Sequence, residues 1–147
     1  MIRAVLTALA LAACSGAAFA DSARVIDLAG RIAGEAETRA DAFRTAPAAP
    51  AEAPATGDRL LADLTDFALA ARALSAEIEA RGGPEDLKCI FRGMSRDAGA
   101  RIEALDAAET RADMSRAYAE IARLARQAEQ IAADPEASGP AMSCSSD

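Results

Sequence analysis

Cysteine and methionine are the side chains in this sequence with the most distinctive chemistry. The chain has three cysteines, Cys14, Cys89 and Cys144, and Met94 and Met142 lie close to two of them in sequence. In an oxidising compartment two cysteines usually pair, so we predict a structural disulfide between Cys89 and Cys144. The alternative is a thiol-redox or Cu(I)-handling site, because thiolate and thioether sulfurs are the ligands that Cu(I) prefers. The disulfide is favoured because no Cys-x-x-Cys motif is present.

The sequence contains no histidine, and this absence removes several classes of site. Ser-His-Asp and Cys-His catalysis, histidine zinc sites and Glu-x-x-His di-iron bundles all need this residue. Covalent haem attachment through Cys-x-x-Cys-His is excluded for the same reason. No other catalytic, metal-binding or cofactor-binding motif stands out. We therefore expect a protein without enzymatic activity and without a cofactor.

Residues 1–20 have the features of a signal peptide. Arg3 supplies the basic n-region, and an apolar run from Ala4 to Ala13 has the length of an h-region. Ala18 and Ala20 place small residues at −3 and −1 of a cleavage site, so the mature chain would begin at Asp21. We therefore expect a periplasmic or secreted protein.

A second processing route competes with this one at the N-terminus. The run from Leu11 to Cys14 resembles a bacterial lipobox and is followed by Ser15 and Gly16. In that case Cys14 would become the lipidated first residue of a membrane-anchored lipoprotein facing the periplasm. The short stretch before Cys14 favours cleavage after Ala20, and both routes export the domain.

Positive side chains near Cys89 form the candidate interaction surface. Residues 86–95 are the least alanine-rich part of the chain, and Arg92 lies in them with Arg96 just beyond. Helical periodicity predicts that both arginines are exposed near the predicted disulfide. If one surface has a specific role, we expect it here.

The elements that would position these residues are four amphipathic helices. Apolar side chains recur three and four apart over 21–44, 58–81 and 84–106, and again after a break near 106–110 as far as about Asp134. Gly82 and Gly83 end the second helix, and Pro84 suits the first position of the third. The break before the fourth helix rests on a capping box, either Asp106 with Glu109 or Thr110 with Asp113. A single helix continuing through this point is the alternative.

The fold class that follows is all-α, an antiparallel bundle of about four helices over residues 21–134. Residues 45–58 carry three prolines and predict an exposed Pro/Ala-rich linker, long enough when extended to run the length of a bundle. Residues 135–147 form a Ser/Gly/Pro-rich tail. The third helix would begin at the end of the bundle where the fourth finishes, so the tail can fold back to bring Cys144 to Cys89.

Charge and composition limit the partners. The net charge is −7, and removing residues 1–20 takes away only Arg3, which leaves −8. Basic residues form no stripe, and there is no Trp, so we expect neither nucleic acid nor an anionic membrane surface as partner. No mature segment is apolar enough to span a membrane. The sequence predicts a non-enzymatic binding or structural module of the bacterial envelope with an unidentified protein partner, and it leaves the oligomeric state open.

Overall fold

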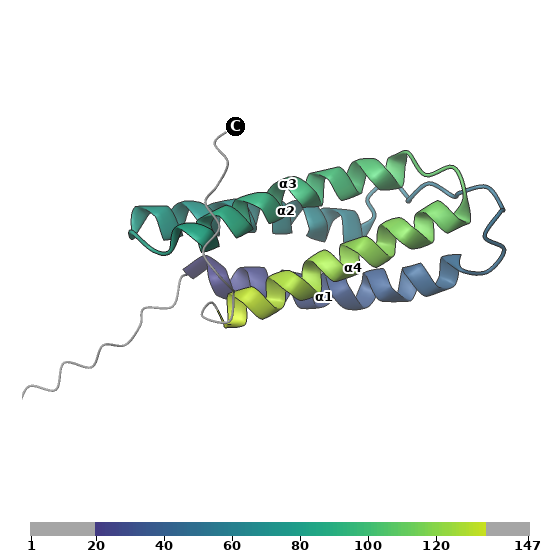
Figure 1. The fold of residues 1–147 in the computed structure, drawn as a ribbon. Helices are drawn as coiled ribbons and strands as arrows, with labels where there is room; N and C mark the ends of the chain where they lie inside the picture. The colour runs from purple at the N-terminus through teal and green to yellow at the C-terminus, as the bar shows by residue number, and fades with distance from the viewer. Residues whose placement is uncertain (1–19, 135–147) are drawn as a thin grey trace, which may run out of the picture.

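Four helices account for most of residues 20–134, the part of the chain that the structure, a computed structural model, describes. The helices are α1 (Ala20–Phe43), α2 (Arg59–Ala80), α3 (Glu85–Asp106) and α4 (Arg111–Ala133). Each runs antiparallel to its neighbours in sequence, and α4 returns to pack along α1 (Figure 1). The all-α antiparallel bundle predicted from the sequence is therefore confirmed. Within the described residues no helix combines the length and apolar character that crossing a membrane requires.

The core follows the apolar stripes of all four helices. Its largest fully buried side chains include Phe67 of α2, Phe91 of α3 and Tyr118 of α4. α1 and α4 pack most extensively on each other, and alanines make up much of what they bury: Ala29, Ala33, Ala36 and Ala40 from α1, and Ala117, Ala122, Ala125, Ala128 and Ala132 from α4. Small side chains let two helix backbones approach closely. The buried alanines therefore suit an extensive contact between α1 and α4.

Backbone signals in the sequence set the helix ends. Gly82 has a positive φ of 65°, and the Gly83 N–H donates to the carbonyl of Ile78 at 2.8 Å, so α2 ends in a glycine cap. Pro84 is the N-cap of α3 rather than its first helical residue, a difference of one position. α3 and α4 are separate helices, because Thr110 and Asp113 form a reciprocal capping box between them.

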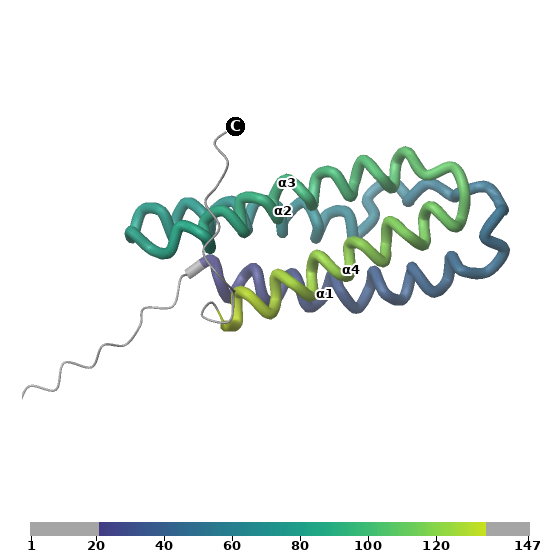
Figure 2. The backbone as a smooth tube through the Cα atoms, in the orientation of Figure 1, coloured from purple at the N-terminus to yellow at the C-terminus, as the bar shows by residue number. Residues whose placement is uncertain are grey.

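The proline-containing linker stays at one end of the bundle and does not run along its length (Figure 2). It joins the end of α1 to the start of α2, and its backbone pairs with the α3–α4 connection. The Ala51 N–H donates to the Glu109 carbonyl, and the Arg111 N–H donates to the Ala49 carbonyl, both at 2.9 Å. Most residues of this segment are exposed, and these bonds hold it against the bundle.

The opposite end of the bundle brings together the start of α1, the α2–α3 turn, the start of α3 and the end of α4 (Figure 1). There the Ser22 hydroxyl donates to the Ala132 carbonyl at 3.1 Å. Residues 1–19 and 135–147 lie outside the described part of the chain, and with them the signal peptide, Cys14, the tail and Cys144. The start of α3 and the end of α4 do share one end, as the predicted disulfide requires.

Candidate functional site

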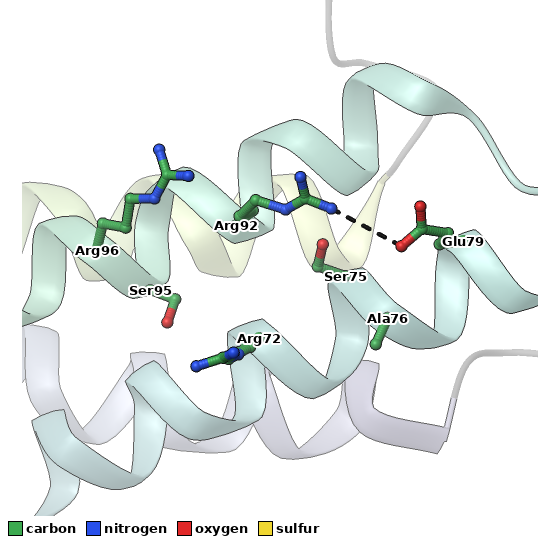
Figure 3. Close-up of a pocket in the computed structure, with 7 residues that line it drawn as sticks. All are labelled: Arg72, Ser75, Ala76, Glu79, Arg92, Ser95 and Arg96. Carbon is green, nitrogen blue, oxygen red and sulfur yellow. Dashed lines mark ion pairs between the residues drawn. The ribbon is translucent and has the colours of Figure 1, made fainter. Parts of the chain in front are cut away.

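A groove of about 380 Å³ lies between the second half of α2 and the first half of α3. Three arginines line it, Arg72 from α2 and Arg92 and Arg96 from α3, together with Ser75, Ala76, Glu79 and Ser95. Figure 3 shows the two helices on either side, with Arg92 and Arg96 projecting from one and Arg72 and Glu79 from the other. We call this set of residues the arginine groove.

Short side chains make the groove hollow. Ser75 is 3% exposed, and its hydroxyl donates to the Lys88 carbonyl at 2.8 Å, which ties α2 to α3 at the base of the groove. Ala76 and Ser95 add little volume, so the long arginine side chains stand around a floor of short ones. The hollow therefore results from small residues at facing positions of two packed helices.

Positive charge predominates in the arginine groove. Its one carboxylate, Glu79, lies 3.4 Å from the Lys88 ammonium and 3.7 Å from the Arg92 guanidinium. Among residues 20–134, Arg72 and Arg96 form no ion pair. In a chain with a net charge of −7, two guanidiniums without a carboxylate partner beside a third are a local reversal of the overall charge.

Two other surface hollows differ from the arginine groove in how their charges are used. One, of about 350 Å³ between α1 and α2, contains Arg31 and Arg39, which pair with Asp63 and Glu35. The other, of about 490 Å³ between α1 and α4, contains Arg126, which donates two hydrogen bonds to Glu37 at 3.0 and 3.1 Å. Each of these two hollows also contains one arginine without an ion pair in residues 20–134, Arg59 in the first and Arg123 in the second. Of these three hollows, the arginine groove retains the most uncompensated charge, with two such arginines.

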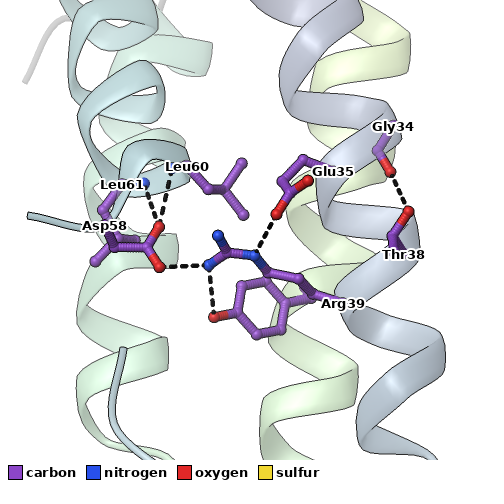
Figure 4. A network of polar contacts seen from close by, with 8 residues as sticks. Gly34, Glu35, Thr38, Arg39, Asp58, Leu60 and Leu61 are labelled. Carbon is purple, nitrogen blue, oxygen red and sulfur yellow. Dashed lines mark hydrogen bonds and ion pairs between the residues drawn. The ribbon is translucent and has the colours of Figure 1, made fainter. Parts of the chain in front are cut away.

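The most complete polar network surrounds Arg39 on α1 (Figure 4). The guanidinium lies 2.6 Å from Asp58 and 2.8 Å from Glu35, and it donates at 3.5 Å to the hydroxyl of the buried Tyr118. Asp58 is the N-cap of α2 and also accepts the N–H groups of Leu60 and Leu61. Each of the side chains Arg39, Asp58, Glu35 and Tyr118 thus has a partner within the protein.

The pKa values of Arg39 and Asp58 follow from this network. Partial burial by itself lowers the pKa of Arg39, but the hydrogen bonds to Asp58, Tyr118 and Glu35 outweigh it and raise the pKa overall. Burial likewise raises the pKa of Asp58, and the hydrogen bonds from Arg39 and the Leu61 N–H outweigh it, so the pKa is lowered. Both groups are held in their charged forms, which suits a structural ion pair.

The sequence-predicted residues fall at two places. Arg92 and Arg96 are accessible on α3, and the structure brings them together with Arg72. Cys89 lies half-buried in the second turn of α3, one turn before Arg92. Met94, the described methionine of the Cu(I) alternative, is 4% exposed and belongs to the core. Met142 and Cys144, the remaining ligands of the Cu(I) alternative, lie outside the described residues.

Sequence reasoning missed the residues that α2 contributes to the site, which are Arg72, Ser75, Ala76 and Glu79. Arg72 and Glu79 lie on the second helix, and only the packing of α2 against α3 places them beside Arg92. The available signal was the antiparallel pairing of two helices joined by a short glycine turn, which sets residues near 75 opposite residues near 88. Comparisons of the chain with protein-family models, curated proteins and solved structures find no match.

Proposed function

We propose that this protein is an exported, non-enzymatic binding module that holds an acidic segment of an envelope protein in the arginine groove. The observation that carries the proposal is the pair of guanidiniums of Arg72 and Arg96, which have no carboxylate partner in residues 20–134 and flank Arg92. Guanidinium groups bind carboxylates through paired, directional hydrogen bonds. An acidic peptide would supply the charges that the groove lacks.

A protein segment suits the groove better than a buried small ligand. The hollow is an open channel between two helices, and two of its arginines reach solvent. Small-molecule sites are usually concave and mostly apolar, whereas this surface is polar and accessible along its length. Aspartate or glutamate side chains spaced along a segment can meet guanidiniums on both sides of the groove.

Export to the periplasm and the disulfide between Cys89 and Cys144 belong to the same proposal. The signal-peptide pattern of residues 1–20 supports export, with lipidation at Cys14 as the competing route. In the periplasm Cys89 and Cys144 would pair. The position of Cys89 at the end of the bundle where α4 finishes supports this pairing, and the bond would anchor the tail one turn from Arg92. Mass spectrometry of the mature protein under non-reducing conditions tests both: we expect Asp21 as the first residue and no free thiol.

The binding proposal is tested by fluorescence anisotropy with a labelled oligo-glutamate peptide and the mature full-length protein. We expect binding that weakens as salt is added, because exposed charge pairs are screened. Arg96→Glu should weaken the affinity about two- to fivefold or more, since each exposed ion pair contributes about 0.2–1 kcal/mol.

The matched control is Arg123→Glu on α4. Arg123 is exposed and forms no ion pair in residues 20–134, but it lies away from the arginine groove. It makes the same change in net charge, so its affinity should stay near the wild-type value. Equal losses in both variants would show that only the overall charge matters and would reject the groove as the site. Absence of peptide binding at low salt would reject the proposal itself.

A further inference from the structure

The outward face of α2 is unusual among the faces of this bundle. It carries Leu69, which is 60% exposed and is the exposed large hydrophobic residue of the described part of the chain. Alanines flank it along the same exposed line, at positions 62, 73, 76 and 80. Asp66 also projects from this face, and Arg59 lies at its edge, beside the hollow between α1 and α2. Neither forms an ion pair with another of residues 20–134. No described element covers this surface.

The residues on this face are arranged symmetrically about Leu69, in a pattern that we call a palindrome: positions at equal distances before and after it carry opposite charges or small side chains. Three residues before it is Asp66 and three after it is Arg72; ten before it is Arg59 and ten after it is Glu79. Between these charges, Ala62 mirrors Ala76 and Thr65 mirrors Ala73. All of these side chains are exposed. Each position before the centre is thus matched by one of opposite charge, or by one of similar small size.

A palindrome of this kind is self-complementary when two identical helices meet antiparallel. A two-fold axis through the centre places residue i of one copy level with its mirror position in the other. We propose that α2 is a homodimer interface, in which Leu69 of two copies meets on the two-fold axis. Asp66 of each copy is then level with Arg72 of the other, and Arg59 is level with Glu79.

The geometry of helix packing favours this arrangement. The exposed line consists of residues 59, 62, 66, 69, 72, 76 and 79. It slants across the helix because its spacing of three or four residues averages less than the 3.6-residue helical turn. A left-handed crossing of about 20° between two helices, the class found in coiled coils, brings two such slanted lines together. Alanine and threonine on both sides of Leu69 allow the close approach that lets the long arginine side chains reach across.

This inference shares Arg72 with the arginine groove, so in the dimer Asp66 of the second copy would compete there with the acidic segment proposed above. Arg72 and Glu79 border both surfaces, whereas Asp66 and Leu69 lie outside the arginine groove. Changes at Asp66 or Leu69 therefore test the dimer alone, and changes at Arg96 test peptide binding alone. A single helix pair gives an interface at the small end of the usual range, so we expect a dimer that dissociates on dilution.

The test is sedimentation velocity of the mature full-length protein over a wide concentration range. We expect wild type to pass from monomer to dimer, and Leu69→Lys to shift this transition to at least tenfold higher concentration by placing two ammonium groups on the axis. Asp97→Arg is the control, because Asp97 is exposed on α3 and forms no ion pair in residues 20–134. A wild-type protein that stays monomeric throughout would overturn the inference.

Charge exchange between copies is the sharper test. Asp66→Arg alone and Arg72→Asp alone each set like charges against one another, so each variant should dimerise on the order of tenfold more weakly than wild type. An equimolar mixture restores both opposite-charge pairs, and we expect it to form a heterodimer near the wild-type affinity. If each variant dimerises normally, or if the mixture stays monomeric, the antiparallel pairing about Leu69 is wrong. Circular dichroism confirms that each variant is helical.

Discussion

The Arg39 network and the arginine groove place the same side chain in opposite situations. Arg39 is packed between α1, α2 and α4, with its side chain 23% exposed and each carboxylate within 3 Å. In the groove the Arg92 side chain is 43% exposed and lies 3.7 Å from Glu79, while Arg72 and Arg96 have no such partner in residues 20–134. The charge of Arg39 is neutralised by carboxylates of the fold, whereas the charges of Arg72 and Arg96 are not neutralised within the described residues.

This difference separates residues that hold the bundle together from residues that can act on a partner. An arginine that forms ion pairs with two carboxylates inside the protein, as Arg39 does, contributes to stability. An exposed arginine without a carboxylate partner adds little to stability, so its guanidinium remains available to a ligand. The comparison predicts that substitutions in the two regions affect different measurements.

The largest effect is expected at Asp58. Asp58→Ala removes the N-cap of α2 and the partner of Arg39 together, and we expect a loss of about 2 kcal/mol in the free energy of unfolding. Asp58→Asn keeps a capping oxygen and loses only the charge, so about 1 kcal/mol is expected. Urea unfolding of both variants measures this difference.

Asp66→Ala is the control for these two variants, because Asp66 is an exposed aspartate of the same helix without an ion pair in residues 20–134. Its stability should stay within about 0.5 kcal/mol of wild type when measured at a concentration where the protein is monomeric. Equal losses for Asp58→Ala and Asp58→Asn would show that the ion pair dominates and that the cap contributes nothing.

Acid should weaken the Arg39 network next. The pKa of Asp58 is lower in the folded protein than in the unfolded chain, where it is about 3.9. The unfolded state therefore binds the proton more readily, and the stabilisation is complete above about pH 4 and is lost as the pH falls through the folded-state pKa. The gap in unfolding free energy between wild type and Asp58→Asn should shrink over this range. A gap that is constant down to pH 2 would contradict the ion-pair account of the lowered pKa.

The sequence predicted the helices closely because each carries its own signals. Heptad-spaced apolar residues such as Leu64, Phe67 and Leu74 define the buried side of α2, and Gly82 and Gly83 mark its end. Even the break before α4 was encoded locally, in the capping pair Thr110 and Asp113, although the sequence offered a second candidate box and could not choose between them. Capping hydrogen bonds and burial periodicity depend on residues only a few positions apart, so the sequence alone predicts them.

The candidate site was only half predictable because it depends on two helices. Arg92 and Arg96 were identified from their own segment, but Arg72 joins them only through the packing of α2 on α3. The Arg39 network joins residues that are 19 and 79 positions apart. The linker is joined to the α3–α4 connection by backbone hydrogen bonds and by the Arg111 guanidinium, which donates to the Thr45 carbonyl at 2.9 Å. Tertiary contacts of this kind have no short-range pattern.

The smallest effect on stability is expected at Arg96. Arg96→Met keeps the aliphatic stem and removes a guanidinium that has no ion-pair partner among the described residues, so the free energy of unfolding should change by less than about 0.5 kcal/mol. Peptide binding should nevertheless weaken, which separates the groove from the Arg39 network. A loss above about 1 kcal/mol in urea unfolding would mean that a carboxylate of the chain itself already occupies the groove. The arginines would then stabilise the fold as Arg39 does, and the groove would no longer be free for a partner.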